Sequence, residues 1–162
     1  MKYCKLDTSM GALVVGWDES GVKEILLPGW HGGVRTVESG DMPGTVMDAL
    51  DFLKGYFQGA SRSAFPGLRR LLDAAGMDGL RREVMERTAA IPYGETMSYG
   101  DVAVSVGRPR AARAVGSFMA SNPFPILVPC HRVVLSSGRC GRYRGGSLMK
   151  EALLLMERRM LE

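Results

Sequence analysis

Apolar and polar positions follow a β-type pattern at the start of the chain and a helical pattern further along. Residues 11–18 and 21–28 are rich in β-branched and other apolar residues and are joined at Glu19-Ser20-Gly21. This arrangement predicts two antiparallel strands connected as a hairpin. Residues 29–43, which mix glycines with charged residues, predict a loop.

A helical period begins at Val46. Apolar residues recur at i, i+4, i+7 and i+11 as far as Phe57, which is the stripe of an amphipathic helix. Gly76 interrupts the later part of this region, and most of the excess basic charge lies beyond it. We therefore expect an α/β protein in two parts: an α/β domain with a small antiparallel sheet over residues 1–76, and a mostly helical domain over residues 77–162.

The second half of the chain predicts helices with defined ends. Residues 79–92 have a helical pattern that stops at a proline. Ser98, followed by Asp101, fits a capping box that starts another helix, and Gly107 ends it. A further helix is expected from just after Pro109 to Asn122. Two short helices joined by a turn with glycine predict a helix-turn-helix.

Length and composition limit the class of protein. The chain has 162 residues, 46% hydrophobic and 23% charged, which suits one domain or two small ones. No apolar run approaches the roughly 18 residues that span a bilayer, and the first residues lack the apolar segment of an export signal. We expect no membrane partner, a location in the cytoplasm (or the nucleus if the source is eukaryotic), and three cysteines that remain thiols.

The net charge of +4 is unevenly distributed. Residues 102–150 contain eight basic side chains and no acidic one, which indicates a surface for a polyanion; an ordinary basic face is the alternative. Because this window covers the predicted helix-turn-helix, DNA is the expected partner. Ala112, Ala114 and Gly116 would let the second helix approach DNA closely with little sequence preference. Packing in a core is the alternative for such small residues, and both can hold on opposite faces of the helix.

Cys130 lies in the segment VPCHRVV, residues 128–134. Pro123 and Pro125 exclude a helix before it, so we expect a β-like apolar segment that delivers Cys130 to a sharp corner. A buried structural cysteine is the alternative. A reactive cysteine needs a base to take the thiol proton. His131 is adjacent, but a hydrogen bond between these neighbours requires a bent backbone or a bridging water.

A histidine base is often oriented by a carboxylate, and Glu157 is the candidate. Its neighbours one turn away on the expected C-terminal helix are apolar, so we expect a half-buried carboxylate that needs a partner. A surface glutamate paired with Arg158 is the alternative.

Four segments together resemble one family. IPYGETMSYGDVA, GRPRAARAVG, NPFPILVPCHRVV and GRYRGG, in this order, are similar to segments of the O6-alkylguanine-DNA alkyltransferases, and the resemblance covers residues 79–161. It implies an RNase H-like N-terminal domain and a winged-helix-like C-terminal domain. It also implies a monomer that binds the minor groove of double-stranded DNA. The protein would transfer an alkyl group irreversibly from O6 of a flipped-out guanine to its own cysteine, without a cofactor; O4-alkylthymine stays open as a second substrate.

The resemblance also implies roles for individual residues. Cys130 would accept the alkyl group, His131 would act as a base through water, and Glu157 would orient His131. Asn122 would link the DNA-binding helix to the cysteine segment, and Tyr99 would press on the phosphate. Arg113 would enter the DNA stack, with Ala112, Ala114 and Gly116 beside the DNA. Tyr143 would donate to guanine N3, with Val133 beside the base.

No metal site is expected, and two other classes of protein compete with this interpretation. Cys4 and His31 are too few ligands before residue 76 for a zinc site. A non-enzymatic protein that binds alkylated lesions would lack Cys130. A thiol hydrolase would need an oxyanion hole, and no glycine-rich turn at Cys130 supplies one. The role of Cys140 stays open.

Overall fold

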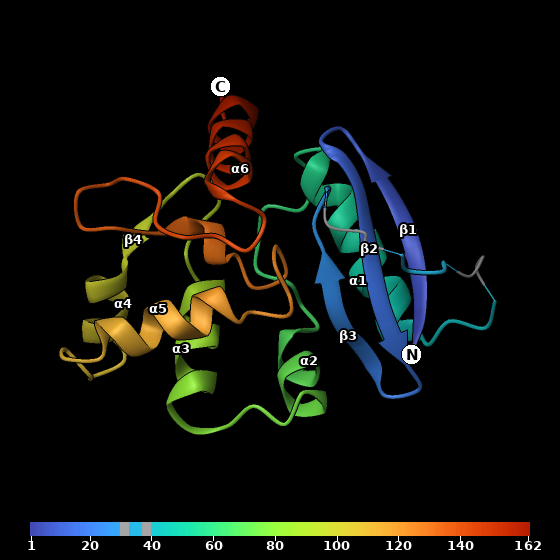
Figure 1. Ribbon diagram of the computed structural model, residues 1–162, viewed down its shortest axis with the longest axis horizontal. Coiled ribbons are helices and arrows are strands. Elements are labelled where there is room, and N and C mark those ends of the chain that lie inside the picture. The colour runs from blue at the N-terminus through green and yellow to red at the C-terminus, as the bar shows by residue number, and fades with distance from the viewer. Residues whose placement is uncertain (30–32, 37–39) are drawn as a thin grey trace. The chain divides into compact units, whose positions relative to one another are not determined.

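The computed structural model describes the chain except for residues 30–32 and 37–39 (Figure 1). Its described residues form two compact units. The first unit consists of Met1–Gly76 and Pro123–Leu127, and the second of Met77–Asn122 and Val128–Glu162.

The segment Pro123–Leu127 differs from the expectation of two continuous domains. It belongs to the first unit, where the backbone N–H of Ile25 donates to the carbonyl of Pro123 at 2.8 Å. Phe124 and Leu127 are almost completely buried. Apolar burial therefore adds this segment to the core of the first unit, although it lies far from residue 76 in the sequence.

The sheet of the first unit is antiparallel, in the order β1 (Lys2–Thr8), β2 (Gly11–Asp18), β3 (Gly21–Leu26). The predicted hairpin is therefore confirmed. Strand β1 was not predicted, because Cys4 and Leu6 are its buried apolar residues and two positions are too few for a clear alternating pattern.

Helices α1 (Gly44–Phe57) and α2 (Leu68–Ala74) complete the first unit. Helix α1 contacts β1 and β3, and α2 contacts β3 (Figure 1). The predicted apolar stripe of α1 faces this core, with Leu53 completely buried and Leu50 only partly so.

The second unit consists mainly of helices. A short parallel pairing of Met97 with Val133 joins two segments that are distant in sequence. No helix of the described residues is long and apolar enough to cross a membrane. The elements of the unit are α3 (Gly79–Ala89), β4 (Met97–Ser98), α4 (Tyr99–Ser105), α5 (Ala112–Ala120), the 3-10 helix η1 (Cys130–Arg132), β5 (Val133–Val134) and α6 (Ser147–Met160).

Helices α4 and α5 pack against each other across a tight turn, as the helix-turn-helix prediction requires. The Ser98 hydroxyl caps α4 by accepting the backbone N–H of Asp101 at 3.0 Å. Gly107 ends α4 with a positive φ of 73°, and the N–H of the next residue, Arg108, donates to Ala103 O at 2.9 Å. This double turn is a Schellman motif, which only glycine adopts at low cost. Helix α5 starts at Ala112, slightly later than expected.

Candidate active site around Cys130

Cys130 is the first residue of η1 and is 3% exposed. The residues before it do not form the expected β-like segment: Ile126 has a positive φ of 77°, and the chain between the prolines and Cys130 is irregular. The N–H of Arg132 donates to Pro129 O at 2.9 Å, so the backbone bends at Cys130. The backbone at Cys130 and His131 is therefore bent and not extended.

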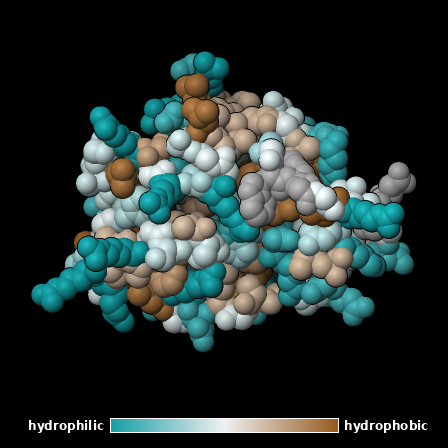
Figure 2. All heavy atoms as spheres, in the orientation of Figure 1, coloured by the Kyte–Doolittle hydropathy of each residue, from teal (hydrophilic) through white to brown (hydrophobic). Residues whose placement is uncertain are grey.

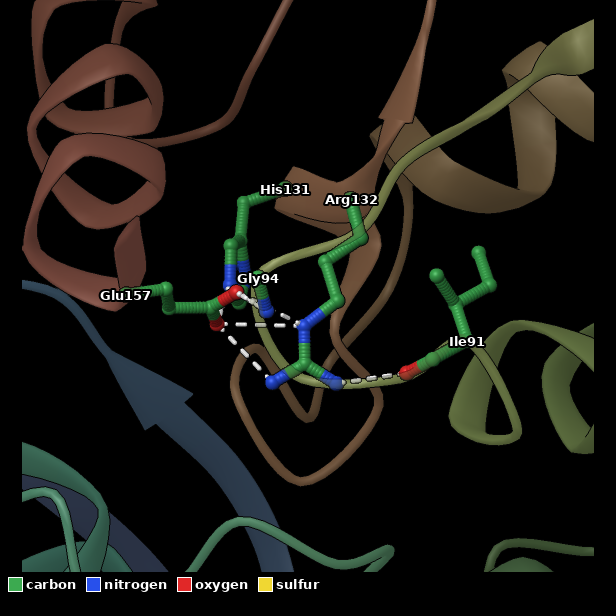
Figure 3. Close-up of polar contacts among 5 residues, drawn as sticks. All are labelled: Ile91, Gly94, His131, Arg132 and Glu157. Atoms are coloured by element: carbon green, nitrogen blue, oxygen red, sulfur yellow. Dashed lines mark hydrogen bonds and ion pairs between the residues drawn. The ribbon is translucent and has the colours of Figure 1, made fainter. Parts of the chain in front are cut away.

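His131 and Glu157 form a completely buried pair. His131 Nε2 lies 2.7 Å from Oε1 of Glu157, which projects from α6 toward η1 (Figure 3). Burial alone would raise the pKa of the Glu157 carboxyl, but hydrogen bonds and charges from His131 and Arg132 outweigh it and lower the pKa to about 2. A carboxylate can only accept, so Nε2 carries the hydrogen and Nδ1 is the basic nitrogen of the neutral ring.

Arg132 is the second partner of Glu157 and was missed by sequence reasoning. Its Nε lies 3.1 Å from each carboxylate oxygen and its Nη2 lies 2.8 Å from Oε1 (Figure 3). Its Nη1 donates to Ile91 O at 2.7 Å, and the guanidinium lies 5.4 Å from the centre of the Tyr93 ring. Glu157 is therefore fully buried rather than half-buried, and its arginine partner is Arg132 rather than Arg158.

A backbone donor completes the surroundings of Glu157. The N–H of Gly94 donates to Oε2 at 2.9 Å (Figure 3). Gly94 has a positive φ of 83°, which favours glycine in this loop. The carboxylate thus receives charge and hydrogen bonds from three sides, which compensates the cost of burying it.

Lys150 is a second basic residue that sequence reasoning missed. It lies on α6, is 1% exposed, and donates from Nζ to Val133 O. Its Nζ lies 3.4 Å from the Tyr99 hydroxyl and 5.8 Å from the centre of the Tyr143 ring. Burial lowers the pKa of Lys150, although the nearby thiols of Cys130 and Cys140 act in the opposite direction.

The protonation states around Cys130 follow from burial. The pKa of the thiol is raised because the thiol is removed from water, although the side chain of Asn122, the charge of Lys150 and the Tyr143 hydroxyl oppose this rise. The pKa of His131 is lowered by burial, and Arg132 and Lys150 add to this effect while Glu157 opposes it. The resting site therefore pairs a neutral thiol with a neutral imidazole, which can serve as a base.

Tyr99, predicted to contact the phosphate, and Tyr143, predicted to contact the base, both have their hydroxyls near the thiol. Burial raises the pKa of the Tyr99 hydroxyl, as do the nearby Cys130 and Cys140 thiols. The pKa of Tyr143 lies well above its usual value because its hydroxyl is buried and faces Cys130. Val133 is completely buried in β5, directly after η1.

The other predicted DNA-contacting residues lie on α5. Arg113 is exposed, while Ala112, Ala114 and Gly116 are half-buried. Val115 and Met119 face the core, so the helix has a packing face and an open face. After α5, Asn122 is buried and its Nδ2 donates to Val128 O at 2.9 Å, which connects the helix to the cysteine segment.

The predicted absence of a metal stays a prediction. Among the residues that the structure describes, no three His, Cys, Asp or Glu side chains come together in a group that could hold a metal. His31, considered above as a ligand, lies outside the described residues.

Comparisons with known proteins identify the family. Residues 79–159 match the family model of the 6-O-methylguanine DNA methyltransferase DNA-binding domain. The methylated-DNA–protein-cysteine methyltransferase of Homo sapiens is 36% identical, over 97% of this chain and 80% of the relative, and that of Mycobacterium bovis is 38% identical over 96% and 92%. A crystal structure of Mycobacterium tuberculosis OGT in complex with DNA superposes with a TM-score of 0.72 at 31% identity, covering 99% of this chain and 94% of the other. With its buried Cys130 beside His131 and Glu157, the chain belongs to the methylated-DNA–protein-cysteine methyltransferase family.

Proposed function

We propose that this protein is an enzyme of DNA repair, which transfers a methyl or alkyl group from O6-alkylguanine in DNA to its own Cys130. The observation that carries the proposal is the buried thiol of Cys130 next in sequence to a buried histidine, His131, whose ring lies in hydrogen-bond contact with the carboxylate of Glu157. The names of the relatives, and the DNA complex of the similar Mycobacterium tuberculosis protein, support the same activity and DNA as the partner.

The chemistry begins with the thiol proton. His131 takes this proton through a bridging water at Nδ1, and the negative Glu157 stabilises the imidazolium that forms. The sulfur then attacks the alkyl carbon: a carbon–sulfur bond forms, the bond from carbon to O6 breaks, and its electron pair goes to the guanine. Tyr143 keeps its proton because its pKa is raised, so it can donate a hydrogen bond to guanine N3 and stabilise the leaving base.

The reaction happens once for each protein molecule. The product on Cys130 is a thioether, which has neither a hydrolysable carbonyl group nor a good leaving group. No residue of the site can return it to a thiol, so the protein is consumed stoichiometrically. This chemistry needs no cofactor.

On the DNA side, α5 would lie in the minor groove of a duplex. Ala112, Ala114 and Gly116 allow a close approach with little sequence preference, and Arg113 fills the place of the flipped nucleotide. Tyr99 presses on the phosphate beside it, and Asn122 couples α5 to the cysteine segment. O4-alkylthymine stays a candidate second substrate.

We infer further that the protein acts as a monomer in the cytoplasm, or in the nucleus of a eukaryotic source. We also infer that its first unit is RNase H-like and that its second is winged-helix-like. The antiparallel sheet with α1 and the packed pair of α4 and α5 support these two assignments.

Two other functions fit less well. A protein that only binds alkylated lesions has no use for a cysteine buried beside a base, and this chain carries Cys130. A thiol hydrolase would pass through an acyl intermediate, whose oxyanion needs donors that the sequence around Cys130 does not provide.

Intact and peptide masses test the proposal directly. After incubation with a duplex that contains one O6-methylguanine, we expect the protein to gain one methyl group on Cys130, in proportion to the lesion, and Cys130→Ser to gain none. A folded wild-type protein that binds the lesion without any mass gain would show a binding protein instead. A gain that disappears with time would show a hydrolase.

A further inference from the structure

The segment from Leu135 to Gly146 carries basic charge that the mechanism does not use. It begins with a tight turn in which the N–H of Leu135 donates to Arg139 O at 2.9 Å. Arg139 and Arg142 are exposed. Neither side chain has a hydrogen bond or ion pair with any described residue, and the sequence from 102 to 150 contains no acidic residue to attract them. We call Leu135–Gly146 the arginine loop.

Tyr99 fixes the position of the arginine loop relative to α5. A Cβ atom at Gly141 would lie 2.8 Å from the Tyr99 hydroxyl oxygen, so the loop backbone rests against this side chain. A Cβ atom at Gly116, on α5, would lie 3.9 Å from Cδ1 of the Tyr99 ring. Tyr99 therefore has α5 on one side and the arginine loop on the other.

A second contact holds the far end of the loop. Arg144 Nη1 donates to the carbonyl of Asn122, just after α5, at 3.5 Å. Two other basic residues of the acid-free window, Arg132 and Lys150, are buried and used inside the site. Figure 2 shows hydrophilic side chains projecting from the part of the face that α4, α5 and the loop occupy in Figure 1. Arg113 on α5 is exposed, as are Arg139 and Arg142 on the loop, so both elements carry exposed basic charge.

We propose that the arginine loop is a second contact surface for DNA, in which Arg139 and Arg142 bind backbone phosphates of the duplex that α5 engages. This inference rests on the proposed function and extends it beyond the helix-turn-helix. A guanidinium binds phosphate through parallel hydrogen bonds, and the exposed stems of these arginines have no competing partner among the described residues. Phosphate contacts add affinity without sequence preference.

The salt dependence of binding to an undamaged fluorescent duplex tests the proposal. Each phosphate that a cation neutralises contributes about −0.9 to the slope of log K against log salt concentration. We expect Arg139→Ala and Arg142→Ala each to reduce the magnitude of this slope by roughly 0.9, and the double variant by ~1.8. The corresponding double lysine variant, which keeps the charge, should retain nearly the full slope.

Arg159→Ala is the matched control, because it removes an exposed arginine from α6 and should leave the slope unchanged. A double alanine variant with the wild-type melting temperature and the wild-type slope would overturn the proposal. Methyl transfer to Cys130 is measured on the same wild-type preparation. Failure to transfer would refute the proposed function, whereas an unchanged slope in a transferring protein would refute only the role of the loop.

Discussion

At the scale of single residues, the buried contact between Arg132 and Glu157 sets the properties of His131. The guanidinium holds both carboxylate oxygens, so the carboxylate stays ionised and its Oε1 stays on Nε2 of the ring. The charge of Arg132 also lowers the pKa of His131, as does Lys150 from α6, while Glu157 opposes both. In the mechanism proposed above, Arg132 therefore acts on the reaction through His131.

Replacing Arg132 with methionine should change the pH dependence of methyl transfer. In the proposed mechanism the transfer needs neutral His131, so the rate should fall as pH decreases through the pKa of this residue. Without the charge of Arg132 this pKa is higher, and the fall should begin at a higher pH than in the wild type. Single-turnover rates between pH 5 and 8 check this. The substitution also breaks a buried ion pair, at a cost of about 3–5 kcal/mol, so unfolding is measured in parallel.

Arg132→Lys separates charge from geometry in the same experiment. Lysine keeps the positive charge but cannot hold two oxygens at once, so some stability should be lost while the pH profile keeps its wild-type position. A methionine variant that folds and shows an unchanged profile would contradict the electrostatic role of Arg132.

The sequence pointed to Cys130, His131 and Glu157 as candidates, because a cysteine and a histidine are adjacent and a lone carboxylate lies among apolar residues, and the structure places His131 against Glu157. Arg132 and Lys150 could not be selected in this way. Both lie in the acid-free window, where basic side chains predict a DNA surface, and only the folded chain brings them to a buried carboxylate and a buried carbonyl.

At the scale of helices and strands, the turn between α4 and α5 depends on one backbone conformation. Gly107 has a φ of 73°, and nothing lies within 4 Å of the place where a Cβ would stand. A side chain at this position would therefore lower the free energy of unfolding through the unfavourable backbone conformation, and not through contacts with neighbouring atoms. The decrease amounts to roughly 1 kcal/mol for alanine.

We expect Gly107→Ala to lower the melting temperature by roughly 2–4 °C, and Gly107→Asn to lower it less, because asparagine tolerates positive φ better. Gly44→Ala is a suitable control. It makes the same change at the first residue of α1, where φ is not positive and space is also free, so stability should hold or rise slightly. Equal melting temperatures for Gly107→Ala and the wild type would show that the turn relaxes without cost.

Elements with a clear periodicity were predictable, and those that depend on distant contacts were not. The hairpin of β2 and β3 and the cap at Ser98 follow from local pattern. The apolar residues before Cys130 suggest a strand. In the structure, however, Pro123–Leu127 belong to the first unit, and the backbone that follows bends at Cys130. A local pattern contains no information about such distant contacts.

At the scale of the whole molecule, the buried site makes stability depend on pH. The pKa of Glu157 in the folded protein is about 2, below its usual 4.5. Its contribution to the free energy of unfolding is therefore complete above pH 4.5 and is lost as pH falls toward 2. His131 also has a lowered pKa, so its contribution is complete above its usual 6.5 and is lost as pH falls through the folded value. Both groups therefore make the protein less stable in acid.

Urea denaturation of the wild type and of Glu157→Gln across a pH series measures how much the carboxylate contributes to the free energy of unfolding. At pH 7 the wild type should exceed the variant in free energy of unfolding by on the order of 3 kcal/mol, because the substitution leaves the buried guanidinium of Arg132 without its counter-charge. Below pH 4.5 the wild-type carboxylate is protonated in the unfolded state, so this difference should narrow. Glu162→Gln, an exposed position at the end of the chain, should change stability by no more than about 0.5 kcal/mol at any pH. A difference between the wild type and Glu157→Gln that stays constant down to the lowest pH at which both proteins fold would mean that the carboxylate acts through its shape and hydrogen bonds, and not through its charge.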